Sequence, residues 1–256
     1  MTGARTAGRR SGRGGFLRWV ELDDAEADRS AYPFTLPVVA GLRAAGRLEF
    51  DPSVTFLIGD NGTGKSTLME AIAVAGGFNP EGGSTNFRFA TRSTESSLGA
   101  HLRLVRAVRK PRTGFFLRAE SFYNVATEIE RLNLQGAYGG RSLHERSHGE
   151  AFLELVRQRF GPDGLYLLDE PEAALSVHGC LAMLTLIHEL AAAGSQFIVS
   201  THSPILLAAP GARILQVGGE GSISAVTYDE AQPVAMTRSF LADPARYLHY
   251  LLTDPT

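Results

Sequence analysis

The chain has 256 residues, of which 44% are hydrophobic and 20% are charged. This length and balance predict a folded globular protein, either one large α/β domain or two small ones, and argue against general disorder. The formal net charge of −2 provides no whole-molecule attraction to nucleic acid or to an anionic membrane. Among the 25 basic residues, all but Lys65 and Lys110 are arginine.

Cysteine usage and hydropathy set the expected compartment. Cys180 is the only cysteine, so no internal disulfide can form; we expect a buried thiol and a cytoplasmic protein. The most apolar helical stretch starts at Leu181 but carries His188 and Glu189, and it is shorter than the roughly 20 apolar residues of a membrane span. We therefore expect no membrane insertion. Residues 1–15 are rich in Arg and Gly and lack acids, which predicts a disordered basic tail, with contact to nucleic acid or membrane as the alternative.

The first half of the chain alternates between apolar strand patterns and helix patterns. We expect a strand from Phe16, a short strand before Asp51, a buried strand at Val54–Ile58, a helix from Gly64 to about Ala75, a loop at 78–97, two strands within 101–122 joined by a turn at 110–114, and a helical stretch at 125–134. Gly76 and Gly77 supply the stop signal of the first helix.

The second half continues the alternation. We expect a helix from Gly149 to Phe160, a buried strand at Leu165–Leu168, a helix at Val177–Ala193, a buried strand at Gln196–Ser200, a hairpin in which ARILQV and SISAVTY flank GGEG, and a last helix near Phe240–Leu252. Strands that alternate with helices predict a mostly parallel sheet covered on both faces.

A phosphate-binding loop is the strongest motif. The stretch GDNGTGKST fits G-x-x-x-x-G-K-[ST] and lies between the expected buried strand and helix. Its glycines allow backbone N–H groups to surround phosphate oxygens, Lys65 can reach the β- and γ-phosphates, and Ser66 can bind Mg²⁺. A compact ammonium fits between phosphates better than a guanidinium, which explains a lysine in an arginine-rich chain. The candidate nucleotide-binding residues of this loop are Gly59, Asn61, Gly62, Gly64, Lys65, Ser66 and Thr67.

Polar residues follow two further buried strands. Asp169 and Glu170 end the run LYLLDE, at the edge where open α/β sheets place ligand sites. Asp169 is the candidate Mg²⁺ ligand, and Glu170 the candidate residue that orients or deprotonates the attacking water. His202 follows the next strand and could donate a hydrogen bond to the γ-phosphate; the alternative is a packing or capping role.

Four motifs occur in one order between Gly59 and Pro204: GDNGTGKST, SHGE, LLDEPEAALS and STHSP. In this order they resemble those of the ABC-type ATPase family. The resemblance implies ATP and Mg²⁺ as ligands. It also implies an α/β P-loop NTPase fold: a mostly parallel sheet flanked by helices, an antiparallel β element and a small helical lobe. We expect a single domain at 16–256 that includes this lobe at about 121–160.

The resemblance also implies a homodimer joined by ATP. Ser147 and Gly149 would contact the γ-phosphate of ATP held by the phosphate loop of a second subunit. Residues Ala174–Ser176 would form the loop across the dimer seam. His148, between the two signature residues, stays without an assigned role.

Several residues depart from the family pattern. His148 stands where transporter subunits commonly have Gly, Glu172 stands where they usually have Thr, and Ser203-Pro204 follows His202. These departures favour soluble ATPases related to DNA-repair and anti-phage enzymes. No Gln occurs from Leu68 to Leu134, where the family has one linked to Mg²⁺. Glu120 is the first candidate substitute and Asn124 the second, while Tyr32 or Phe34 could stack on adenine, with ordinary core packing as the alternative.

Three functions remain. The first is a soluble, homodimeric ATPase that couples ATP hydrolysis to a conformational change, and the second is the ATP-binding subunit of a transporter. The third is a nucleic-acid-binding module in which a hairpin directs Arg103, Arg109 and Arg112 at phosphates; a solvated arginine-rich face is the alternative. Only 82 positions separate Lys65 from Ser147, which excludes a long coiled coil between them.

Overall fold

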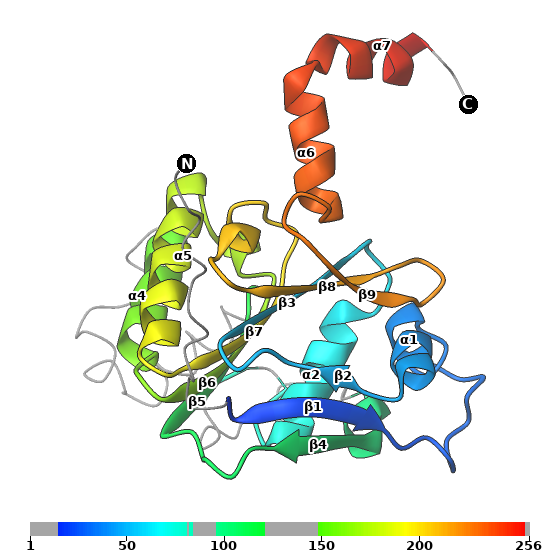
Figure 1. Ribbon diagram of the computed structural model, residues 1–256, viewed down its shortest axis with the longest axis vertical. Coiled ribbons are helices and arrows are strands. Elements are labelled where there is room, and N and C mark those ends of the chain that lie inside the picture. Colours follow the sequence, from blue (N-terminus) through cyan, green and yellow to red (C-terminus); the bar gives the residue numbers. More distant parts are fainter. Residues whose placement is uncertain (1–14, 81, 84–95, 121–147, 254–256) are drawn as a thin grey trace, which may run out of the picture.

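Two β-sheets organise the chain in this computed structural model, which describes residues 15–80, 82–83, 96–120 and 148–253 (Figure 1). The strands are β1 (Leu17–Leu22), β2 (Leu48–Glu49), β3 (Val54–Gly59), β4 (Leu102–Arg106), β5 (Thr113–Arg118), β6 (Gly164–Asp169), β7 (Gln196–Ser200), β8 (Arg213–Val217) and β9 (Ile223–Val226). The α-helices are α1 (Pro37–Ala45), α2 (Lys65–Gly76), α4 (His148–Arg159), α5 (Val177–Ala192), α6 (Gln232–Ala242) and α7 (Pro244–Thr253). Short 3₁₀ helices lie at Ser97–His101 (η1), Pro171–Ala174 (η4) and Leu206–Ala208 (η5).

The larger sheet has the strand order β5-β6-β7-β3-β8-β9. All neighbours pair in parallel except β8 and β9, which form the expected antiparallel hairpin. Every residue of β3 and of β7 is buried. Strands covered on both faces need continuous apolar runs, and this is why VTFLIG and QFIVS lack alternation.

The smaller sheet, β2-β1-β4, is antiparallel. The fully buried side chain of Gln196 connects it to the larger sheet. Its Oε1 accepts hydrogen bonds from the backbone N–H groups of Phe16 and Leu17, both at 2.8 Å, and its Nε2 donates to the carbonyls of Leu17 and Asp51 at 2.8 and 2.9 Å. A buried amide is stable only when its polar atoms are paired, so these four bonds fix the start of β1 over the sheet.

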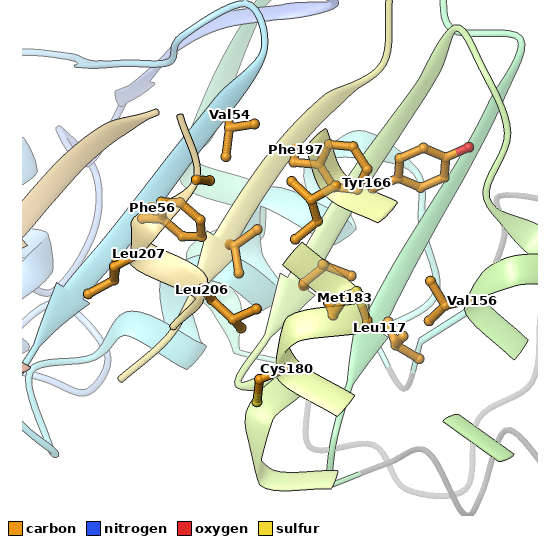
Figure 2. Close-up of a cluster of buried hydrophobic side chains, with 14 of the residues drawn as sticks. Val54, Phe56, Leu117, Val156, Tyr166, Cys180, Met183, Phe197, Leu206 and Leu207 are labelled. Atoms are coloured by element: carbon orange, nitrogen blue, oxygen red, sulfur yellow. The ribbon is translucent and has the colours of Figure 1, made fainter. Parts of the chain in front are cut away.

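Hydrophobic cores form on both faces of the larger sheet, as the sequence predicts. On one face, α4, α5 and η5 pack against the sheet, and the core there includes Tyr166, Cys180, Met183 and Phe197 (Figure 2). The prediction of a buried Cys180 is confirmed. On the other face, α1, α2 and the smaller sheet enclose a second core, in which α2 lies between the two sheets (Figure 1).

The predicted hairpin within 101–122 is wrong. Strand β4 belongs to the smaller sheet and pairs with β1, whereas β5 belongs to the larger sheet and pairs with β6. The turn between them therefore carries the chain from one sheet to the other. Local alternation does not specify the pairing partner, and the buried run Phe115–Leu117 fits a parallel strand better than a hairpin arm.

The single helix predicted near 240–252 is two helices, α6 and α7, which extend away from the sheets (Figure 1). Asp243 has φ −151° and ψ 75°, and Pro244 begins α7. Proline disfavours helical geometry in the preceding residue, so the helix breaks there. The expected helical stretch at 125–134, most of the predicted lobe and residues 1–14 lie outside the described residues, whereas Gly15 is described and buried.

Candidate functional site

The carboxyl ends of four adjacent strands carry the candidate site. In the order β5-β6-β7-β3, these ends present Arg118, Asp169 followed by Glu170, Ser200 with His202 two residues later, and Gly59. Parallel strands place their carboxyl ends at one edge of the sheet, where α/β proteins bind ligands. Four segments that are distant in sequence thereby meet at one edge.

The loop between β3 and α2 has the backbone that phosphate binding requires. Gly59, Gly62 and Gly64 have φ of 150°, 82° and 91°, conformations that side chains disfavour. A Cβ on Gly64 would also lie 2.9 Å from Val38 Cγ1. By contrast, a Cβ on Gly62 would meet nothing within 4 Å among the described atoms, so this glycine serves backbone conformation alone.

Lys65 fills the centre of this loop. Its Nζ donates hydrogen bonds to the carbonyls of Gly59 at 2.8 Å and Asp60 at 3.0 Å, and the residue is 4% exposed. Burial lowers the pKa of Lys65, while Glu170 and Asp169 oppose that shift. The ammonium is held where a phosphate could replace the two carbonyls as its partner.

Ser66 and Asp169 form the candidate metal pair. Ser66 Oγ donates a hydrogen bond to Asp169 Oδ1 at 3.1 Å. Neighbouring ligands of octahedral Mg²⁺ are about 3 Å apart, because each lies about 2.1 Å from the ion, so this pair fits one Mg²⁺. The described residues contain no cluster of three or more His, Cys, Asp or Glu. Mg²⁺ bound with a nucleotide needs only one or two protein carboxylates, since phosphates and water supply its other ligands.

Asp169 is strongly perturbed by its surroundings. Burial raises the pKa of Asp169 to about 6, although Arg118 and the hydrogen bond from Ser66 lower it. A buried carboxyl favours its neutral form until a cation compensates its charge. The site therefore favours a cation beside Asp169.

The side chains of Glu170 and His202 lie next to each other at the ends of β6 and β7. Glu170 has the left-handed backbone conformation, with φ and ψ both 50°, which is uncommon for a residue with a side chain. Its N–H donates to the carbonyl of Ser200 at 2.9 Å, which connects the ends of β6 and β7. Its Oε1 lies 3.8 Å from His202 Nε2. Strained backbone conformations occur most often at active sites and ligand-binding sites, and the conformation of Glu170 fits such a site.

The structure places Arg118, not Glu120, beside Asp169. The Nε of Arg118 is 3.5 Å from Asp169 Oδ2. Glu120 is 88% exposed in its side chain and lies 3.8 Å from Arg118 Nη2. Glu120, the first candidate to replace the missing glutamine, thus contacts Arg118 and not the Ser66–Asp169 pair. Asn124, the second candidate, lies outside the described residues.

The two aromatic candidates for adenine stacking are in different environments. Phe34 is buried and packs edge-on against His101, with ring centroids 5.0 Å apart, so it belongs to the core. Tyr32 is 66% exposed, and its hydroxyl lies 3.4 Å from Thr67 Oγ1. Tyr32 is therefore the aromatic ring next to the phosphate loop. Asn61 is exposed on that loop.

The signature segment is described only from its second half. Ser147 lies outside the described residues, and His148 begins α4. A Cβ on Gly149 would lie 3.2 Å from the carbonyl oxygen of Ala174. Gly149 therefore allows the start of α4 to pack closely on residues 174–175 of the same chain. The two segments that the resemblance assigns to a dimer seam are neighbours within one subunit.

Comparison with known proteins identifies the family. Residues 43–133 match the family described as AAA domain. The vitamin B12 import ATP-binding protein BtuD of Yersinia enterocolitica is 31% identical over 209 residues, which cover 72% of this chain and 76% of that protein. The chain belongs to the ABC-type ATPase family.

A second relative agrees with this assignment, and a solved structure is also similar. The cytochrome c biogenesis ATP-binding export protein CcmA of Rhodopseudomonas palustris is 30% identical over 167 residues, covering 62% of this chain and 82% of that protein. A solved SMC head domain from Thermotoga maritima has 16% identity and a TM-score of 0.44, and the match covers 83% of this chain and 98% of that one. This ABC-type ATPase binds and hydrolyses ATP, and its fold is that of a P-loop NTPase.

Two residues at the site of this ABC-type ATPase are not predicted from the sequence. In the sequence, Arg118 is one basic residue among several on an expected strand, and Glu172 is a departure from the family pattern without an assigned role. Their contacts with Asp169 and His202 join distant segments, and the only sequence signal was that each lies within two residues of another candidate. Within the described part of the chain, no helix is both long and apolar enough to span a bilayer.

Proposed function

We propose that this ABC-type ATPase works as a homodimer that closes on two ATP molecules and couples their hydrolysis to a conformational change. The observation that carries the proposal is the convergence of Lys65, the Ser66–Asp169 pair and the Glu170–His202 pair at one sheet edge. Each group has a distinct task in phosphoryl transfer to water, which depends mainly on positioning and charge stabilisation.

Phosphate binding begins with the loop and Lys65. The loop residues Gly59–Gly64 direct N–H groups at the phosphates, and the N-terminus of α2 adds its positive dipole end. Lys65 Nζ leaves the carbonyls of Gly59 and Asp60 and donates to the β- and γ-phosphates. Tyr32, whose hydroxyl lies 3.4 Å from Thr67 Oγ1, would cover the nucleotide base.

Ser66 and Asp169 would hold Mg²⁺. The ion, when bound, neutralises the charge that develops on the phosphate oxygens. Asp169 accepts the hydrogen bond of Ser66 through Oδ1, so both ligands are oriented before the nucleotide arrives. Preorganisation of this kind lowers the reorganisation required during the reaction.

Glu170 orients the attacking water and receives its proton. Its left-handed backbone directs the segment after β6 back towards β7, where His202 lies. His202 donates a hydrogen bond to the γ-phosphate and keeps the water in line with it. The two side chains are 35% and 40% exposed for His202 and Glu170, so both can reach a ligand outside the sheet edge.

The dimer follows from the signature segment. Ser147 and Gly149 would contact the γ-phosphate on the partner subunit, and residues 174–176 would lie along the seam. Because Gly149 packs on Ala174, closure of the dimer would move the start of α4 and this loop together. The predicted single domain at 16–256, with its lobe at about 121–160, belongs to this proposal.

Glu170→Gln tests the catalytic half of the proposal. Glutamine keeps the size of the side chain but cannot take the proton, so the variant should bind Mg²⁺–ATP and lose turnover by at least about 100-fold. Glu189→Gln, on the exposed side of α5, is the matched control and should hydrolyse ATP normally. Normal hydrolysis by Glu170→Gln would refute the assignment.

The ATP-binding subunit of a transporter is the second candidate. It is favoured by the relatives BtuD and CcmA, whose names assign them to import and export. The altered signature, the missing glutamine and Ser203-Pro204 favour the first candidate instead. Purification of the tagged chain from its own cells in mild detergent separates the two, because a transporter subunit would bring an integral membrane protein in stoichiometric amount.

The ion pairs of Arg103 and Arg109 argue against the third candidate, nucleic-acid binding by the 101–118 segment. Arg103 pairs with Glu21, and Arg109 pairs with Asp163, so their charges are compensated within the chain. Of the three, only Arg112 has no ion pair among the described residues; it is exposed, and one phosphate contact gives little affinity. A role in DNA repair or defence would then depend on a partner, which pull-down with ATP-bound Glu170→Gln can identify.

A further inference from the structure

Arg118 and Ser66 both contact the carboxylate of Asp169, the candidate metal ligand. Strands β5 and β6 pair in parallel with Arg118 directly beside Asp169. The Nε of Arg118 is 3.5 Å from Asp169 Oδ2, while Oδ1 of the same carboxylate accepts the Ser66 hydrogen bond at 3.1 Å. Each oxygen of Asp169 therefore faces a different partner. One is the hydroxyl that would bind Mg²⁺, and the other is a cation from the protein itself.

The other end of the guanidinium is anchored on α2. Arg118 Nη1 donates to Glu70 Oε2 at 2.8 Å, and Glu70 lies one turn after Ser66, on the same side of the helix. Glu70 is itself fixed, because its Oε1 accepts the N–H of Ser96 at 3.2 Å. The side chains of Arg118 and Glu70 are only 20% and 15% exposed, so water screens this pair weakly.

Arg118 also has a second acceptor at the surface, because its Nη2 lies 3.8 Å from the exposed carboxylate of Glu120. Two acidic groups other than Asp169 can thus keep the guanidinium when it leaves Asp169. The Nε, which faces Asp169, makes no hydrogen bond of normal length among the described residues. Of the two buried carboxylates that the guanidinium contacts, Asp169 at 3.5 Å is held less closely than Glu70 at 2.8 Å.

We propose that Arg118 is an internal counter-ion of Asp169 that opposes the binding of a divalent cation there, and that it withdraws from Asp169 while keeping its bond to Glu70 when Mg²⁺ arrives with ATP. The proposal rests on the assignment of Ser66 and Asp169 as metal ligands. A metal ion alone must overcome the repulsion of the nearby guanidinium charge, whereas a metal ion with ATP brings phosphate oxygens that complete its coordination. Arg118 thereby makes metal binding dependent on the nucleotide, and it is a positioning residue rather than a catalytic one.

Mn²⁺ affinity without nucleotide tests this role, since free Mn²⁺ is measured directly by electron paramagnetic resonance. Arg118→Gln removes the competing charge and should bind Mn²⁺ at least about tenfold more tightly than the wild type, because a neighbouring guanidinium lowers the proton affinity of a carboxylate by about one to three powers of ten and opposes a metal cation by the same repulsion. Arg118→Met, which keeps the apolar stem, should behave like Arg118→Gln and provides the comparison if that variant does not fold. Arg118→Lys keeps the charge and should restore weak binding.

Controls separate the counter-ion role from general charge and from folding. Arg109→Gln removes an equal charge that pairs with Asp163 and stacks over Phe16, and its Mn²⁺ affinity should equal that of the wild type. Mn²⁺ affinity in Arg118→Gln or Arg118→Met that equals or falls below the wild-type value would overturn the proposal. Equal tightening in Arg109→Gln would also overturn it, because the effect would then be one of net charge.

A double variant distinguishes this inference from the proposed function. In Arg118→Gln/Asp169→Asn the tighter Mn²⁺ binding should disappear, which supports Asp169 as the ligand that Arg118 guards. Retention of tight binding would overturn the inference, because the ion would be bound elsewhere. Neither result depends on hydrolysis or dimerisation, so failure of Glu170→Gln to trap ATP would refute the catalytic proposal alone.

Discussion

Glu172 holds the backbone of His202: its Oε1 accepts the His202 N–H at 2.5 Å. This bond joins the segment after β6 to the segment after β7. Among the described residues, neither the other carboxylate oxygen of Glu172 nor His202 Nε2 has a hydrogen-bond partner. The backbone of His202 is thus fixed, and its Nε2 is a buried atom 3.8 Å from Glu170 Oε1.

Glu172→Ala should impair hydrolysis through His202. Loss of the acceptor frees the backbone of residue 202, and a misplaced hydrogen-bond donor typically costs tenfold or more in rate, so we expect kcat to fall by about that factor. The KM for ATP should change little, because Lys65 and the loop still bind the phosphates. Glu172→Gln keeps an acceptor oxygen and should retain most of the activity.

Glu230→Ala is the matched control for this variant. Glu230 also accepts a backbone N–H, that of Thr227 at 2.9 Å, but on the exposed hairpin side of the molecule. Its removal should leave steady-state ATPase activity unchanged. Equal kcat values for Glu172→Ala and the wild type would mean that the position of His202 does not limit turnover.

Lys65→Met should abolish stabilisation by nucleotide. A ligand that binds only the folded state raises the free energy of unfolding, by about 2.7 kcal/mol at a concentration 100 times the dissociation constant. Without the ammonium, Mg²⁺–ATP should no longer raise Tm. Lys110→Met replaces the only other lysine, which is exposed, and should keep the full shift. A thermal melt with and without ATP provides the comparison, and a preserved shift in Lys65→Met would be inconsistent with the assignment.

Gly64→Ala should destabilise the protein more than Gly77→Ala. These glycines flank α2 with nearly identical backbones, φ 91° and ψ 16° against φ 89° and ψ 15°. Both variants bear the strain of a left-handed alanine, about 1 kcal/mol. Only Gly64→Ala places a Cβ 2.9 Å from Val38 Cγ1, and overpacking adds about 1–3 kcal/mol. Urea unfolding measures the difference. Equal losses of unfolding free energy in the two variants would show that the Val38 side chain moves aside at no cost.

The stability of the protein should depend on pH through Asp169. Its carboxyl binds a proton with a pKa near 3.8 in the unfolded chain and about 6 in the folded protein. The folded state binds this proton more tightly than the unfolded chain does. Protonation of Asp169 therefore contributes fully to the free energy of unfolding below pH 3.8, and this contribution is lost as pH rises through 6. Asp169→Asn should therefore match the wild type near pH 4 and be more stable above pH 7, by up to about 3 kcal/mol.

Urea unfolding at pH 4, 6 and 7.5 checks this dependence. The difference in unfolding free energy between Asp169→Asn and the wild type should grow as pH rises. A difference that stays constant with pH would mean that Asp169 ionises normally in the folded protein.

The parallel sheet could be predicted because buried strands keep a local signature. The run Gln196–Ser200 matches β7 at both ends, and the phosphate loop lies where strand and helix patterns meet. The pairing of β5 could not be predicted, since partner choice depends on contacts far along the chain. The residue that separates α6 from α7, by contrast, had a local signal in Asp243-Pro244 that outweighs the apolar periodicity around it.

The residues of the candidate site also fall into those that the sequence predicts and those that it does not. Lys65, Asp169, Glu170 and His202 could be proposed because each follows a recognisable strand. The contacts of Arg118 with Glu70 and of Glu172 with His202 could not, because nothing local specifies which distant group a charged side chain meets. The position of Glu120 along the chain suggests a metal ligand, whereas in the structure its exposed side chain lies 3.8 Å from Arg118 Nη2.

The oligomeric state of Glu170→Gln is the most direct test of a homodimer closed by ATP. Sedimentation velocity with saturating Mg²⁺–ATP should show a dimer with one ATP bound per chain, and a monomer without nucleotide. Addition of Ser147→Arg to this variant should return the monomer while ATP stays bound. A Glu170→Gln chain that remains monomeric with ATP bound, or dimerises without it, would contradict an ATP-closed homodimer.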